Sequence, residues 1–286
     1  MPAVTASGPS TAIPSPAVLK AASVDGPAVD SLFVSDKAAR QSASESIVSL
    51  IQKDGPSAVK SLGFIDAVVK ALNDKKSPGA REGAAEAVIA VSKVAASALE
   101  PFFIDSGLYA VLVETFADKM PAVRTAAIEA VSSFVVHANS WAAPLLLPAL
   151  LHQIKTAGKW HVKIGALTVL DRLVVSAPQQ TAKLMPEIVP VLSEAIWDTK
   201  ADVKKHARES LTKATALVSN KDIERFIPAL IKSLINPVEE VPKTIQLLSA
   251  TTFVSEVDSA TLSLMVPLLS RGLSEKLTAT KRKVAV

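Results

Sequence analysis

The 286-residue sequence has no cysteine, no glycine-rich loop and no long apolar run. The missing cysteines exclude disulfides, thiolate metal sites and cysteine nucleophiles, and they fit a reducing compartment, so we expect a cytoplasmic protein. No stretch of 18 apolar residues occurs, and the most apolar segment, residues 131–151, is interrupted by His137, Asn139 and two prolines. The sequence therefore predicts no membrane span.

Patterns of common catalytic and metal sites are missing as well. Neither the phosphate-binding pattern Gly-x-x-x-x-Gly-Lys-Ser/Thr nor the nucleophile pattern Gly-x-Ser-x-Gly occurs. The histidines lie on separate segments without the spacing of paired metal ligands. We therefore expect no catalytic residue, no metal, no cofactor and no small-molecule substrate in this chain.

A basic residue recurs about every forty positions along the chain. The markers are 39 to 43 residues apart, and six of the seven are followed three residues later by alanine; the Lys243 repeat has Gln246 instead. The seven markers are Arg40, Arg81, Arg124, Lys163, Lys204, Lys243 and Arg282. This period in an alanine- and leucine-rich chain is typical of stacked helical hairpins. It predicts an all-α fold, an α-solenoid of about seven HEAT repeats forming an armadillo-like superhelix, with a truncated last repeat.

The chain divides into two parts on composition. Residues 1–30 mix Pro, Ser, Thr, Ala and Gly and predict a disordered leader, whereas residues 31–286 form the predicted solenoid. In the third repeat we expect helical regions over 101–116 and 122–137, and the alanines should let paired helices approach closely. Because the last repeat stops shortly after Lys281, we expect the chain to be a fragment of a longer protein.

Prolines and aspartates recur with the same period. One set of prolines lies 14 or 15 residues before a marker and predicts helix kinks or first turns: Pro148, Pro190, Pro228 and Pro267. Asp118 and Asp198 lie six residues before Arg124 and Lys204, respectively. Each can cap the second helix of its repeat or pair with the basic marker of a neighbouring repeat. The fourth repeat lacks this aspartate.

Positive charge is concentrated in the second half of the chain, although the net charge is only +4. Residues 155–208 hold nine Lys or Arg against five Asp or Glu, and residues 271–286 hold five against one. An acidic partner such as nucleic acid along this half is one interpretation, and solvated helix faces are the other. Nucleic-acid contacts are predicted at Lys159, Trp160, Lys163, Lys204, Lys205, Arg208, Lys281, Arg282 and Lys283.

Other roles remain open for some of these candidates. Trp160 can stack on a base while its neighbouring lysines contact phosphate, or it can pack on the adjacent repeat. Lys204 is a marker and suits a structural role, so Lys205 and Arg208 are the better candidates for partner contact. Trp141 and Trp197 lie beside apolar stripes, and we expect both in the core.

Several longer motifs resemble the elongation factor 3 family, the fungal-type ribosome-associated ATPases. They begin at Met185-Pro-Glu-Ile-Val-Pro-Val-Leu-Ser-Glu and Trp197-Asp-Thr-Lys200. They continue with Asn220-Lys-Asp-Ile-Glu-Arg-Phe-Ile-Pro228, Ala250-Thr-Thr-Phe-Val254, Met265-Val-Pro-Leu-Leu-Ser-Arg-Gly-Leu273 and Lys281-Arg-Lys283. Residues 32–184 resemble the family more loosely, through Asp74-Lys-Lys76 and Lys159-Trp160.

The resemblance implies an N-terminal HEAT domain that in the family precedes a helical bundle and two ABC-type cassettes. It also implies the ribosome as partner, with small-subunit RNA and proteins contacted by a monomer, and ATP as the cofactor of the full-length factor, which promotes release of tRNA from the exit site. The chain ends before any cassette, so no ATP hydrolysis is assigned to it. Two alternatives are the HEAT region of a ribosome-associated activator of the amino-acid-starvation kinase and a protein-only adaptor scaffold.

Overall fold

A computed structural model describes residues 29–276 and 278–285, and this part of the chain is helical, without β-strands. The predicted leader therefore lies almost entirely outside the described residues. Side chains at the helix entrances explain several boundaries: Asp36, Ser77 and Asp258 each accept a hydrogen bond from the backbone N–H three residues later. Within the described ranges, none of the helices has the length and apolar character needed to cross a membrane.

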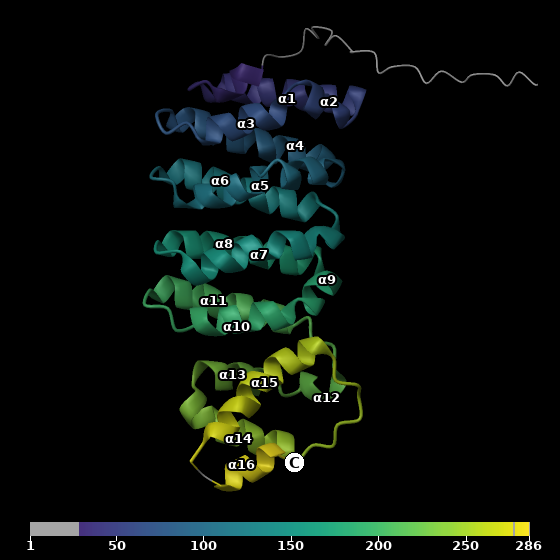
Figure 1. The fold of residues 1–286 in the computed structure, drawn as a ribbon, viewed down its shortest axis with the longest axis vertical. Helices are drawn as coiled ribbons and strands as arrows, with labels where there is room; N and C mark the ends of the chain where they lie inside the picture. The colour runs from purple at the N-terminus through teal and green to yellow at the C-terminus, as the bar shows by residue number, and fades with distance from the viewer. Residues whose placement is uncertain (1–28, 277, 286) are drawn as a thin grey trace, which may run out of the picture.

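Two layers of helices run side by side through the first five repeats (Figure 1). The first layer contains α2 (Ser57–Ser61), α3 (Phe64–Leu72), α5 (Leu108–Glu114), α7 (Ala143–Thr156) and α10 (Met185–Ala195). The second layer contains α1 (Lys37–Asp54), α4 (Pro78–Asp105), α6 (Pro121–His137), α8 (Trp160–Ser176) and α11 (Ala201–Thr215). The connecting short helices are η1 (Val29–Phe33), η2 (Thr115–Ala117), η3 (Ser140–Ala142), α9 (Pro178–Lys183) and α12 (Lys221–Glu224). Each helix packs on the same helix of the next repeat, as the α4–α6 and α6–α8 contacts show.

The periodic alanines lie in the continuous core. Five of the six are buried, namely Ala43, Ala84, Ala127, Ala166 and Ala207, and the sixth, Ala285, is exposed at the end of the last helix. Because alanine ends at Cβ, the second-layer helices approach one another closely at these positions. Gly165 allows an even closer approach, because an added Cβ would lie 2.8 Å from Cδ1 of Ile128 on the neighbouring α6.

The third repeat differs from the sequence prediction at its first helix. Instead of one helical region over 101–116, α4 continues through Pro101 to Asp105, and a separate α5 begins at Leu108. Gly107 has a left-handed φ of +76°, which interrupts the helix and which glycine adopts without steric cost. The second helix agrees with the prediction, because α6 covers Pro121–His137.

The periodic prolines occupy two kinds of position, helix interiors and a first turn. Pro148, Pro190 and Pro267 lie inside α7, α10 and α15 (Ser259–Ser274), where each removes a backbone donor. Pro228 lies instead in the first turn of α13 (Ile227–Ile235), where no intrahelical donor is needed.

The last two helix pairs interleave instead of stacking in chain order. The first layer continues from α10 to α15, while α13 packs on α11 of the second layer. The sixth level of the stack is therefore α13 with α15, and the seventh is α14 (Pro237–Ser249) with α16 (Thr278–Ala285) (Figure 1). Two connections permit this order: Asn236 alone joins α13 to α14, and the extended segment 250–258 carries the chain back toward α10.

Candidate nucleic-acid interface

Three of the basic markers form ion pairs across repeat boundaries. The Nε of Arg40 lies 2.8 Å from Oε2 of Glu86, and the Nε of Arg81 lies 2.7 Å from Oδ2 of Asp118. A third pair joins the Nζ of Lys163 to Oδ2 of Asp198 at 2.7 Å. We call this series the ladder. It shows that these markers hold neighbouring repeats together.

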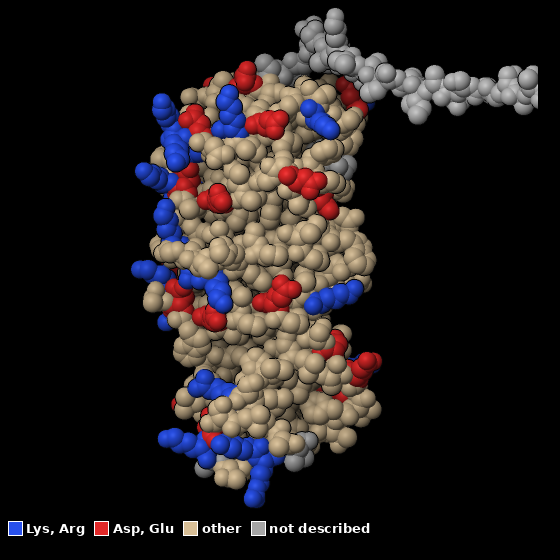
Figure 2. Space-filling view, viewed as in Figure 1, with Lys and Arg blue, Asp and Glu red and all other residues tan. Residues whose placement is uncertain are grey.

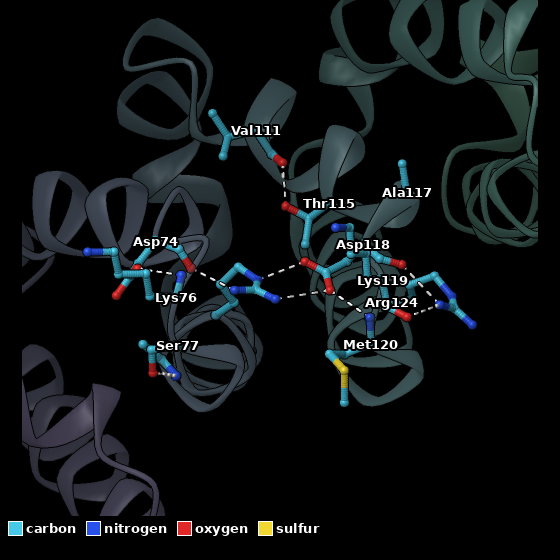
Figure 3. A network of polar contacts seen from close by, with 12 residues as sticks. Asp74, Lys76, Ser77, Val111, Thr115, Ala117, Asp118, Lys119, Met120 and Arg124 are labelled. Atoms are coloured by element: carbon cyan, nitrogen blue, oxygen red, sulfur yellow. Dashed lines mark hydrogen bonds and ion pairs between the residues drawn. The ribbon is translucent and has the colours of Figure 1, made fainter.

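Of the two roles predicted for the aspartates, the structure confirms pairing with the marker of a neighbouring repeat, whereas α6 and α11 have no side-chain cap. Besides its marker, Asp118 accepts a hydrogen bond from the backbone N–H of Met120 through Oδ1 (Figure 3). Asp198 accepts one from the N–H of Lys200 in the same way. Burial alone would raise the pKa of Asp118, but the hydrogen bonds from Arg81 and Met120 and the nearby guanidinium charges hold that pKa below its ordinary value. The pKa of Asp198 is lowered against the same burial effect by Lys163 and Lys200.

Lysines project from the turns that join the two helices of a repeat. Lys75 and Lys76 lie between α3 and α4, Lys119 between η2 and α6, Lys159 between α7 and α8, and Lys200 between α10 and α11. All five are exposed, and we call this row the turn edge. In Figure 2, Lys and Arg side chains gather along the left side of the stack, over these turns, with acidic side chains between them. The turn edge therefore begins in the second repeat, earlier than the charge distribution of the sequence predicts.

Sequence reasoning selected only Lys159 from this row. The sequence does contain a signal for the others. Lys76, Lys119, Lys159 and Lys200 recur at intervals of 43, 40 and 41 residues, each one or two residues before the helix that carries a marker. Adjacent packed helices are about 8 to 10 Å apart, so the lysines follow one another at about this spacing. Lys75, Lys119 and Lys159 also line one pocket of about 360 Å³, together with the Arg81–Asp118 pair.

The candidates around Trp160 have different environments. Trp160 is 46% exposed at the start of α8, with its ring edge-on to His161, so it is accessible to a partner. Lys159 is exposed, although its Nζ donates to the carbonyl oxygen of Ala117 at 2.7 Å and thereby links the fourth turn to the third. Lys163 is largely buried in its ladder pair with Asp198, which leaves it little exposed surface for RNA.

The remaining candidates lie toward the C-terminal end of the stack. Lys205 and Arg208 are exposed on α11, close in sequence to Lys200 of the turn edge. Lys204 is half-buried and, among the described residues, makes no side-chain ion pair. The exposed cluster Lys281, Arg282 and Lys283 lies on α16, separated from α11 by the sixth level.

The expectation that two tryptophans belong to the core is wrong. Trp141 is 69% exposed and Trp197 is 58% exposed. The Nζ of Lys183 lies 5.4 Å from the ring centroid of Trp141, a distance suited to a cation–π interaction. The apolar stripes in these regions bury smaller side chains such as Leu146 and Leu192, which leaves the two indoles outside.

Comparisons with known proteins identify two family models along the chain. The model described as EF3 N-terminal HEAT repeat matches residues 40–211, and the model described as Elongation factor 3/GNC1 HEAT repeat matches residues 239–286. Elongation factor 3 of Mycosarcoma maydis is 54% identical over 258 residues, which cover 90% of this chain and 24% of that protein. Elongation factor 3A of Saccharomyces cerevisiae is 44% identical over 228 residues, which cover 78% of this chain and 21% of that protein. The chain thus spans about a quarter of the length of these relatives.

Solved structures add little to this result. A designed armadillo repeat protein is 16% identical to this chain and has a TM-score of 0.41. The alignment covers 90% of this chain and 95% of the designed protein. In the part of the chain that the structure describes, no group of three or more His, Asp or Glu side chains is placed to hold a metal ion.

Proposed function

This chain belongs to the elongation factor 3 family of HEAT-repeat proteins, and we propose that its turn edge docks the factor on RNA of the small ribosomal subunit. The chain is a translation elongation factor HEAT region. In the whole protein, docking through this region would position the ATP-dependent machinery that promotes release of tRNA from the exit site.

The observation that carries the proposal is the exposed lysine row of the turn edge. Within the described ranges, none of its five lysines forms an ion pair, so their charges are available to a partner. Phosphates attract lysine regardless of base sequence, and each neutralised phosphate releases bound counterions. A row of single lysines at helix spacing therefore suits an RNA backbone better than a small ligand. Trp160 adds one aromatic surface for an unpaired base within the row.

Charge reversal of the turn edge tests the proposal. The variant carries Lys75→Glu, Lys76→Glu, Lys119→Glu and Lys200→Glu. A control variant carries four reversals at exposed lysines elsewhere, Lys53→Glu, Lys60→Glu, Lys93→Glu and Lys232→Glu, so that the net charge is the same. Binding to purified small ribosomal subunits is measured by sedimentation across a KCl titration, with circular dichroism as the check on helical content.

We expect the turn-edge variant to lose at least about tenfold in affinity at low salt. The slope of log affinity against log salt concentration should become shallower by about 3. The control variant should lose much less. Equal losses in the two variants, or none in either, would contradict the proposal. Binding that persists at high salt and after ribonuclease treatment would point instead to a protein-only adaptor. Reversal of Lys205 and Arg208 together tests whether the interface continues onto α11.

A further inference from the structure

The ladder of ion pairs is interrupted at Arg124. The aspartates of the third and fifth repeats lie six residues before the next marker, and the residue at this position in the fourth repeat is Ala157. Its backbone dihedrals, φ −62° and ψ 127°, are close to those of Asp118, φ −55° and ψ 149°. The two turns therefore have similar backbone conformations at this position, and the fourth repeat lacks the carboxylate. Arg124 is left without the partner that Arg81 and Lys163 have.

Arg124 is nevertheless held in place. Its Nη1 donates to the carbonyl oxygens of Asp118, at 2.9 Å, and Lys119, at 3.1 Å (Figure 3). No hydrogen bond from its Nε or Nη2 to another described residue is present. A guanidinium fixed on one side, with donors remaining on the other, can bind a carboxylate or phosphate in bidentate fashion.

Two further nitrogen-bearing side chains lie near Arg124. The Nε2 of His161 is buried and has no hydrogen-bond partner among the described residues. The Nζ of Lys159 donates to the carbonyl oxygen of Ala117, and Nη1 of Arg124 donates to those of Asp118 and Lys119, so both cations meet at the turn 117–119, with His161 two residues beyond Lys159. Burial lowers the pKa of His161, and the charges of Arg124 and Lys159 lower it further. An unsatisfied buried nitrogen costs stability, so a bound acceptor would remove an existing penalty.

We propose that this break in the ladder, formed by Arg124, His161 and Lys159, binds one backbone phosphate of RNA in place of the missing carboxylate. The phosphate accepts from the guanidinium of Arg124 and from Nε2 of His161, while Lys159 supplies charge from the turn edge. The inference rests on the proposed function, because the RNA strand that follows the turn edge supplies the phosphate. It adds a half-buried site that orients the strand, where the exposed lysines provide only attraction.

Restoring the carboxylate gives the sharpest test. In Ala157→Asp, the new side chain should pair with Arg124 as Asp118 pairs with Arg81, so the midpoint of urea unfolding should rise. The same change should weaken binding to a fluorescein-labelled 20-nucleotide RNA by about tenfold, since one charge-assisted phosphate contact is lost. The matched control, Lys163→Gln, breaks an existing ladder pair and should lower stability with little effect on RNA affinity. A loss of RNA affinity in Lys163→Gln equal to that in Ala157→Asp would overturn the proposal.

Arg124→Lys tests the site without introducing negative charge. It keeps the charge but loses the bidentate geometry, and we expect RNA affinity to fall about threefold or more. The source of the phosphate is resolved by the ¹⁵Nε signal of Arg124, which should shift with RNA at micromolar concentration and only weakly with inorganic phosphate at millimolar concentration. A signal that responds to inorganic phosphate alone would overturn the assignment to RNA.

Failure of this inference is distinguishable from failure of the proposed function. If the turn-edge reversals abolish binding to small ribosomal subunits but Ala157→Asp and Arg124→Lys bind RNA like the unmodified chain, docking through the turn edge stands and the phosphate site is wrong. If the turn-edge reversals have no effect on subunit binding, the proposed function itself is wrong.

Discussion

Arg81 reaches across a repeat boundary and binds Asp118 with two nitrogens, Nε at 2.7 Å from Oδ2 and Nη2 at 3.2 Å from Oδ1. A third donor, Nη1, binds the carbonyl oxygen of Asp74 at 2.6 Å within its own repeat. Both charged side chains are largely buried. One guanidinium thus joins the turns of two repeats, which explains why a basic residue recurs at this position.

Asp118→Asn should destabilise the fold through this pair. Removing one charge of a buried pair leaves the other without its partner, and we expect the free energy of unfolding to fall by about 3 kcal/mol in urea titration at pH 7. The control, Glu194→Gln, breaks an exposed pair with Lys155 whose atoms are 3.9 Å apart, and it should cost less than about 1 kcal/mol. Similar losses in the two variants would contradict a structural role for the ladder.

The same pair predicts a dependence on pH. The pKa of Asp118 is lower in the folded chain than in the unfolded one, so its stabilising contribution is present above the unfolded pKa, near 3.8, and is lost as the pH falls through the folded pKa. Unfolding free energies measured between pH 6 and pH 3 should therefore fall less steeply for Asp118→Asn than for the unmodified chain. Parallel curves of unfolding free energy against pH for the two proteins would show that Asp118 does not contribute to the loss of stability in acid.

Gly83 should tolerate no side chain. An added Cβ would overlap the carbonyl oxygen of Leu32 and Cδ of Arg40, so Gly83→Ala must displace η1 or the first ladder arginine. We expect a loss of about 2 to 3 kcal/mol in urea unfolding. Gly79→Ala is the matched control in the same helix, because its nearest contact would be an ordinary 3.6 Å, and it should change stability little. Equal effects would mean that the close contact at Gly83 is relieved at no cost.

Tyr109, the only tyrosine of the chain, links the third and fourth repeats. Its hydroxyl donates to the carbonyl oxygen of Leu146 at 2.7 Å, and burial raises the pKa of the phenol well above 10. Because the folded pKa is raised, the associated stability is present below the unfolded pKa and is lost as the pH rises toward the folded one. Absorbance at 295 nm should show no phenolate until the pH is well above 10. Titration near pH 10 with the helices intact would contradict this burial.

We expect Asp222 to fix segment 250–258, the connection that lets the last two helix pairs interleave. Its Oδ2 accepts hydrogen bonds from the backbone N–H groups of Val254, at 2.7 Å, and Ser255, at 2.6 Å. These two bonds, that of Ser255 first, lower the pKa of Asp222 against a smaller opposing effect of desolvation. In Asp222→Ala we expect limited proteolysis to cut within residues 250–258 several times faster, while Asp202→Ala on α11 serves as the control. Unchanged cleavage would show that other contacts hold the segment.

Much of the fold could be predicted because its causes are local. The marker and alanine periods follow from helix geometry, and Asp118 and Asp198 stand out because each lies six residues before a marker. The sequence left open whether they cap a helix or pair with a marker, and packing of neighbouring repeats decided for the pair. The break at Gly107 was missed because the surrounding residues keep a helical pattern. The exposed positions of Trp141 and Trp197 were missed because large apolar side chains near a stripe usually lie inside, and smaller residues fill this core instead.

The sequence by itself determined the helical hairpins and their forty-residue period, since these depend on neighbours along the chain and on one repeated register. Only the tertiary structure decided that α15, not α13, packs on α10, because this choice depends on how far segment 250–258 reaches and which apolar faces fit. It also decided that Arg124 and Lys159 bind carbonyl groups of the same turn, because residues from different repeats meet only when neighbouring repeats are packed together.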